Sequence, residues 1–239
     1  MTMFGKIAGA AAALTMLAAA GQASAATYTF STGTGSSADG PISGQAVITT
    51  GVNSLTVALT SLINNPTSIG QEVSGIVITL AGVPGSVTLG SASGVLIDGD
   101  GNPVAGSVDH WGAAISGGKI YLATAGTGAE GGMPKYLITG GSPYTNGNAS
   151  IDVHAPSIQN TGTFVLNLTG ASNPVITGVS IEFGTGPDKS LVAACTAGCV
   201  PPGVPEPASW AMLIVGFGMV GAGLRQRRRL GGLAKAYLD

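Results

Sequence analysis

Apolar and polar residues alternate along several stretches in the middle of the chain. The alternation has a period of two over 44–50, 54–60 and 74–81, and it returns over 161–169 and 174–183. A period of two places every second side chain on one face of an extended strand, so these stretches predict half-buried β-strands. Residues 50–53 join the first two stretches tightly enough to predict a β-hairpin.

The last two stretches also predict which side chains share a face. In 161–169 the shared face carries Phe164, Leu166 and Leu168. In 174–183 it carries the odd-numbered positions from Val175 to Phe183. No stretch between 26 and 200 shows the apolar spacing and caps of a helix. The sequence therefore predicts an all-β domain over 26–194, with a β-sandwich as the expected architecture and a β-helix-like fold as the alternative.

The first 25 residues follow a different pattern. Lys6 provides a positive charge, an apolar run follows over 7–20, and Ala23, Ser24 and Ala25 form a small-residue cleavage site. This order is typical of a secretory signal peptide over 1–25, with a retained N-terminal anchor as the alternative. The domain that follows is expected to be exported.

Charge is scarce and unevenly placed. Only 8% of the 239 residues are charged, and the four arginines all lie at Arg225, Arg227, Arg228 and Arg229. Between 26 and 200 there are three lysines and nine acidic residues. A mildly acidic domain without arginine lacks the basic surface that binds phosphate backbones, so nucleic acid is not an expected partner.

The C-terminal region predicts a membrane segment. Residues 208–224 carry no charge, and as a helix they would span about 25 Å, near the minimum for a bilayer. Trp210 stands where an interfacial aromatic belongs, and the arginine cluster is a stop-transfer signal that keeps the basic tail 225–239 in the cytoplasm. A buried core helix is the alternative.

Two prolines flank an acidic residue just before that segment, and together these features resemble a known signal. Pro205, Glu206 and Pro207, then Trp210 and Ala211, then the apolar span and the arginines stand in a fixed order. This order resembles the PEP-CTERM sorting signal of Gram-negative bacteria, in its PEPxxWA variant typical of alphaproteobacteria such as sphingomonads. The resemblance covers about 204–229, and the chain departs from the pattern by continuing through 230–239.

The resemblance implies a partner and a route. The partner is exosortase, a membrane-embedded, cysteine-protease-like enzyme that cuts near the motif and releases or transfers the exported part. The route leads from an intermediate anchored in the inner membrane to the cell surface or extracellular matrix. Several pieces of the middle domain, such as 65–80, 94–112 and 146–158, also resemble the ectodomains of short PEP-CTERM proteins of unassigned function, which implies a shared fold and no catalytic residues.

Candidate sites within the domain are few. Asp98, Asp100 and Asn102 alternate as calcium ligands do, but Pro103 stands where a calcium loop needs glycine. A plain turn is therefore the favoured interpretation, and a calcium site is the alternative.

His110 and His154 each lie near an acid, yet two histidines are too few for a metal site or a catalytic set. The glycine-rich run 127–132 lacks the lysine and helix of a phosphate loop. We therefore expect no metal, no cofactor and no enzymatic activity.

Two cysteines close the domain. Cys195 and Cys199 stand in the 195–207 linker, and in an oxidising compartment they are expected to form a disulfide, with metal binding or redox chemistry as the alternative.

The function expected from these features is that of an exported, non-enzymatic protein of the surface or matrix, associated with exopolysaccharide or biofilm. The alternative is an envelope-anchored carbohydrate-binding module. In that alternative aromatic side chains stack against sugar rings, and the candidates are Trp111, Tyr121, Tyr136 and Tyr144.

Overall fold

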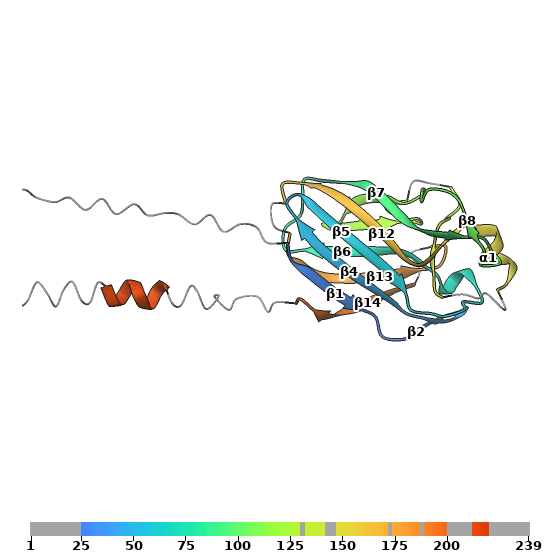
Figure 1. The fold of residues 1–239 in the computed structure, drawn as a ribbon, viewed down its shortest axis with the longest axis horizontal. Helices are drawn as coiled ribbons and strands as arrows, with labels where there is room; N and C mark the ends of the chain where they lie inside the picture. Colours follow the sequence, from blue (N-terminus) through green and yellow to red (C-terminus); the bar gives the residue numbers. More distant parts are fainter. Residues whose placement is uncertain are drawn as a thin grey trace, which may run out of the picture. The chain divides into compact units, whose positions relative to one another are not determined.

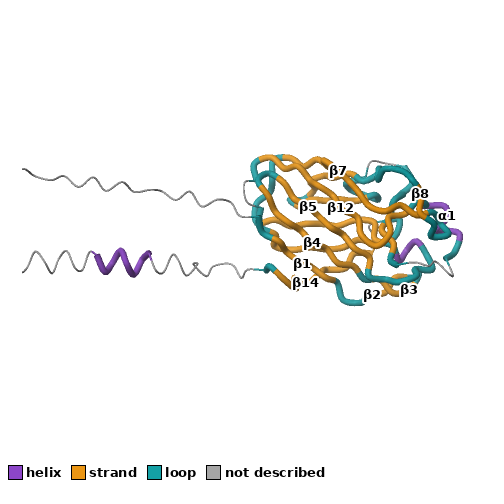
Figure 2. Tube along the Cα trace, in the orientation of Figure 1, coloured by secondary structure: helices purple, strands orange, loops and turns teal. Residues whose placement is uncertain are grey.

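The computed structural model describes residues 25–129, 132–141, 147–171, 174–186, 189–199 and 212–219. The chain divides into two compact units, Met1–Gly198 and Cys199–Asp239. In the described residues of the first unit, strands are the main regular structure, joined by loops (Figures 1 and 2). The prediction of an all-β domain is confirmed.

The strands are β1 (Thr27–Ser31), β2 (Gly35–Ser37), β3 (Gly40–Ile42), β4 (Gly44–Gly51), β5 (Ser54–Ser61), β6 (Val73–Leu80), β7 (Ser86–Ile97), β8 (Pro103–Val104), β9 (Gly112–Ser116), β10 (Lys119–Ala123), β11 (Ile138–Thr139), β12 (Ser157–Thr169), β13 (Ile176–Phe183) and β14 (Lys189–Ala197). A 3-10 turn, η1 (Ile69–Gln71), precedes β6, and a short helix, α1 (Ala149–His154), precedes β12.

Twelve of the strands form one sheet, in the order β8-β7-β12-β5-β4-β1-β14-β13-β6-β10-β9 with β11 off this path. Strand β11 pairs with β12 in parallel and with β6 antiparallel, both through Ile138. This double pairing closes the sheet on itself, because β12 and β6 otherwise lie far apart in the strand order. Strands β2 and β3 form a separate hairpin.

The closed sheet differs from the expected sandwich, in which two separate sheets face each other. Here β1 pairs with both β4 and β14, so hydrogen bonds run continuously from one layer to the other. The β-helix alternative is wrong for the described residues, since their strand pairings are antiparallel except for that between β11 and β12. A β-helix needs parallel coils stacked in succession.

The predicted strands occur within a few residues of their expected bounds, and the hairpin at 50–53 is present with Gly51 opposite Ser54. One predicted face is correct only in its second half, where Val179, Ile181 and Phe183 are buried. The register of β13 shifts between Ile176 and Gly178, so Ile176 is buried while Val175 is 51% exposed. Alternation therefore holds only in the second half of this strand.

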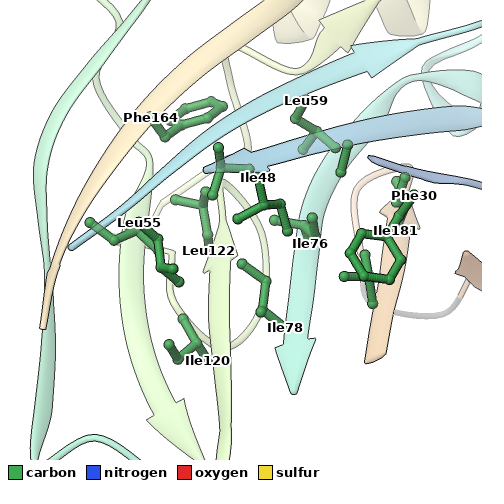
Figure 3. Close-up of a cluster of buried hydrophobic side chains, with 14 of the residues drawn as sticks. Phe30, Ile48, Leu55, Leu59, Ile76, Ile78, Ile120, Leu122, Phe164 and Ile181 are labelled. Atoms are coloured by element: carbon green, nitrogen blue, oxygen red, sulfur yellow. The ribbon is translucent and has the colours of Figure 1, made fainter. Parts of the chain in front are cut away.

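The core fills the interior of the closed sheet. Alternate residues of β4 and β5, such as Ile48, Leu55 and Leu59, point toward side chains from β6 and β10, such as Ile76 and Leu122 (Figure 3). All five are fully buried. Each such aliphatic side chain stabilises the fold by roughly 1.5–3 kcal/mol relative to exposure, so this face holds the strands in register.

Two features at the edges of the domain were not expected. Strand β14 runs to Ala197 and pairs Cys195 with Phe30 of β1, so residues 195–197 belong to the sheet and not to the linker. Helix α1 is only six residues long, too short to give a helical pattern, and begins with the Asn148 side chain accepting from Ser150 N. That capping bond is what identifies it locally.

Candidate functional site

The loop 134–136, just before β11, is held by side chains from three other segments. Its first carbonyl oxygen contacts His154 Nδ1 at 2.6 Å, its second accepts from the Thr124 hydroxyl, and its third accepts from Trp111 Nε1 at 2.9 Å. The amide of Tyr136 also donates to the carbonyl oxygen of Pro156 at 2.9 Å. Each of the three carbonyl oxygens of the loop therefore has a side-chain hydrogen-bond partner, and these bonds hold the loop against the rest of the domain.

Trp111 anchors this loop to the core. Its side chain is only 1% exposed, and its ring lies 4.3 Å from that of Phe164 at an interplanar angle of 37°. A buried indole that donates to a carbonyl is a structural anchor. The expectation that Trp111 stacks against sugar rings is therefore wrong, because its ring faces are covered.

His110 and Tyr136 share an unusual backbone conformation. Their φ angles are +61° and +57°, in the left-handed region that bulky side chains rarely enter. Each costs about 1–3 kcal/mol, which the surrounding anchors must offset. The two conformations bring the imidazole and phenol rings to 5.8 Å between centroids, nearly parallel at 24°. Neither side chain is fully buried.

Asp109 completes this group, which we call the His110–Tyr136 cluster and define as Asp109, His110 and Tyr136. The Asp109 carboxylate lies 3.5 Å from His110 Nε2, and the Asp109 and His110 side chains are 59% and 39% exposed. Partial burial raises the pKa of Tyr136, and the charge of Asp109 and a hydrogen bond to it raise it further. The phenol therefore stays protonated and can donate.

The two histidines do not form a shared site. His110 stacks on Tyr136, whereas His154 contacts the carbonyl oxygen of Pro134, so they meet the same loop at different points. Within the described ranges, no group of three or more histidine, cysteine or acidic side chains is placed to hold a metal.

The loop with alternating acidic residues is a turn. Asp98 Oδ1 accepts from the backbone amides of Asp100 and Asn102, at 3.0 and 2.8 Å. These bonds, led by that from the Asn102 backbone, lower the pKa of Asp98. The carboxylate is thus engaged in closing the turn between β7 and β8, as the plain-turn reading expects.

Glu72 is a buried acid that sequence reasoning missed. It is 0% exposed and directly precedes β6. Ser157 donates to its Oε2 at 3.3 Å, and Thr139 also hydrogen-bonds the carboxyl. Its Oε1 has no hydrogen-bond partner among the described residues. Burial raises the pKa of Glu72 to about 8, with the two hydroxyls partly opposing the shift.

The signal for Glu72 was present in the sequence. Positions 72, 74, 76, 78 and 80 alternate along β6, and Ile76, Ile78 and Leu80 all face the core. Extending the period of two backwards places Glu72 on the same buried face. Glu182 on β13 is 5% exposed, and burial raises its pKa as well.

The described part of the first unit has shallow hollows on its surface. One, of about 210 Å³, lies between Asp39, Ile69 and Phe183; another, of about 400 Å³, lies between β7 and β9. Neither is lined by histidine or cysteine. Of the other two aromatic candidates, Tyr121 is half-buried on β10, and Tyr144 lies outside the described residues.

Most of the predicted sorting and processing residues also lie outside the described residues. These are Ala23, Pro205, Glu206, Pro207, Trp210, Ala211, Arg225, Arg227, Arg228 and Arg229. Ala25, the other predicted cleavage residue, is described and exposed just before β1. Within the predicted membrane segment, residues 212–219 are described and helical, with exposed apolar side chains such as Leu213 and Phe217. In the described part of the chain, no helix has the length and apolar character needed to cross a bilayer.

Both cysteines are in the disulfide-bonded state. Cys195 lies on β14, directly opposite Phe30, and its side chain is exposed. A bridge that begins on this strand ties the end of the sheet to the residues that follow it. Because the loop that it closes is short, its contribution through chain entropy is modest.

Comparison with known proteins identifies the C-terminal segment. Residues 203–229 match the PEP-CTERM protein-sorting motif. No curated protein matches the chain. Among solved structures, the crystal structure of the KRT10-binding region domain of the pneumococcal serine rich repeat protein PsrP is similar at 22% identity over 72% of this chain and 90% of that chain, with a TM-score of 0.26.

The motif confirms the resemblance based on the Pro-Glu-Pro sequence, the apolar span and the arginine cluster. A PEP-CTERM motif implies an exported protein that is membrane-anchored before processing and is sorted by exosortase. The chain thus carries an exosortase sorting signal behind an all-β domain.

Proposed function

We propose that this protein is a non-enzymatic component of the cell surface or extracellular matrix, delivered by exosortase and associated with exopolysaccharide. The sorting motif at 203–229 is the observation that carries the proposal. In this account the signal peptide 1–25 directs export, the segment 208–224 holds the intermediate in the inner membrane, and the all-β domain is the delivered part.

The non-enzymatic role rests on the sequence, which offers no motif that pairs a nucleophile with a base. The structure supports this proposal because several of the candidate side chains have structural roles. His154 and Trp111 hold a loop, and Asp98 closes a turn. A closed sheet around a largely aliphatic core is suited to persist outside the cell, where no chaperone assists refolding.

Replacing Pro205, Glu206 and Pro207 together by alanine tests the sorting step. Exosortase is expected to ignore this variant, so an antibody against the all-β domain should find it in the inner membrane, while the wild type is at the surface or in the medium. Deletion of 230–239 is the control, and it should sort normally because that tail follows the motif. Equal distribution of the triple variant and the wild type would contradict the proposal.

The alternative of an envelope-anchored carbohydrate-binding module is favoured by one observation. The His110–Tyr136 cluster presents a partly exposed pair of rings beside an exposed carboxylate. Such a group suits a polar ligand with apolar faces, which is the character of a sugar.

A further inference from the structure

The His110–Tyr136 cluster combines backbone strain with a loop that is anchored by several hydrogen bonds. Two bulky residues adopt left-handed conformations that glycine would adopt without strain. The loop that carries Tyr136 is fixed by bonds from His154, Thr124 and Trp111. Strain that persists at the surface, held by a rigid support, is characteristic of ligand-binding positions.

The chemistry of the cluster fits a pyranose ring. A pyranose has a face of C–H groups, which packs against an aromatic ring, and a rim of hydroxyls. The rings of Tyr136 and His110 stack on each other, so an outer face of the stacked pair supplies the aromatic surface. The exposed Asp109 carboxylate keeps acceptor capacity for a sugar hydroxyl beside its hydrogen bond with Tyr136. Because Asp109 also lies beside His110 Nε2, the acceptor and the rings are fixed relative to each other.

The charge of the domain limits which saccharide can bind. Asp109 is an exposed acid, and the domain between 26 and 200 carries nine acidic residues against three lysines. A uronic acid or sulfated sugar would be repelled at the point where its hydroxyls must approach. An uncharged hexose unit meets no such cost.

We propose that the His110–Tyr136 cluster is a binding site for a neutral saccharide unit, with an outer face of the stacked ring pair packing on the sugar face and Asp109 accepting from a sugar hydroxyl. This inference rests on the proposed association with polysaccharide and gives that association a location. It does not depend on exosortase, so binding by purified protein and sorting in cells fail independently.

Binding is measured with full-length protein in a detergent that has no sugar headgroup, by calorimetry. The probes are the neutral oligosaccharides cellohexaose, laminarihexaose and maltohexaose, and a trigalacturonate as the acidic comparison. We expect at least one neutral probe to bind and the acidic probe not to bind. Binding of no neutral probe, or of the acidic probe alone, would overturn the proposal.

His110→Gly separates a binding role from a structural one. Glycine relieves the left-handed backbone while removing the ring, so the melting temperature should stay at or above that of the wild type while affinity for the neutral probe falls roughly tenfold. The matched control is Asn160→Gly, another left-handed and exposed position outside the cluster, which should leave affinity unchanged.

Asp109→Asn tests the specificity. An amide keeps an acceptor oxygen but removes the charge, so the variant should retain weakened binding of the neutral probe and begin to bind trigalacturonate. If His110→Gly lowers the melting temperature without changing affinity, the strained pair is structural and the proposal is wrong. Unchanged affinity in both cluster variants would overturn it equally.

Discussion

Replacing Glu72 by glutamine is expected to remove most of the pH dependence of stability between pH 4.5 and about 8. In the wild type, burial raises the pKa of this carboxyl from 4.5 to about 8. The fully buried side chain has two hydroxyl partners, Ser157 and Thr139, and an Oε1 without one. Its charged form is therefore costly inside the sheet.

The sign of this pH dependence follows from the number of protons that the folded and unfolded chains bind. Below pH 4.5 the carboxyl is protonated in both the folded and unfolded chains, so its burial costs least. Between pH 4.5 and 8 the unfolded chain loses the proton and the folded chain keeps it, so the free energy of unfolding decreases as pH rises. Above pH 8 the loss is complete, at about 3–5 kcal/mol for a shift of this size.

Chemical denaturation of the full-length protein at about pH 4.5, 6, 7 and 8.5 would measure this effect. The wild type should lose stability steadily across the series, whereas Glu72→Gln should lose much less. The slope that remains is assigned to Glu182, since burial raises the pKa of that carboxyl as well. Asp100→Asn is the control, since that carboxylate is exposed in the turn after β7 and its loss should leave the slope intact. Parallel curves for the wild type and Glu72→Gln would show that the buried carboxyl does not govern the dependence.

Replacing Trp111 by alanine is expected to lower the free energy of unfolding by about 3–5 kcal/mol. The substitution removes a side chain that is 1% exposed and packed against Phe164, and it leaves a cavity beside the core. It also releases the carbonyl oxygen of Tyr136, so the loop 134–136 loses one of its three side-chain anchors.

Trp111→Phe separates the contribution of aromatic packing from that of the hydrogen bond to Tyr136. Phenylalanine keeps an aromatic contact with Phe164 but cannot donate to the Tyr136 carbonyl, so its cost should be about 1–3 kcal/mol. Val192→Ala, at a position 82% exposed, should change stability by less than about 0.5 kcal/mol. Denaturant midpoints measure all three variants, and a Trp111→Ala variant as stable as Val192→Ala would contradict the anchoring role.

The strands that alternate strongly were predictable, and the reason is burial on one face. Residues of β4 and β5 alternate strictly between buried and exposed or half-exposed, so their pattern reflects the core directly. Strand β7 was not predicted because glycine and serine occupy much of it and most of its first ten residues are exposed. Strand β11 has only two residues, too few for any period, yet it closes the sheet.

The candidate functional sites also differ in whether the sequence alone predicts them. The sorting signal could be found from sequence because its parts are contiguous and stand in a fixed order. The His110–Tyr136 cluster could not, because its two segments are distant in sequence: Trp111, the residue after His110, stands 25 residues before Tyr136. Left-handed backbone at His110 and Tyr136 also has no sequence signal, since neither residue type favours it strongly.

The central claim, that the chain is an exported exosortase substrate, is tested most directly by the intact mass of the protein in envelope and medium fractions from cells with and without exosortase. The account predicts a product that begins near Ala26 and ends near Pro207, present only when exosortase is present. A product that runs to Asp239 in both strains would contradict it. The C-terminal segment would then be a permanent anchor, and the all-β domain a membrane-tethered one.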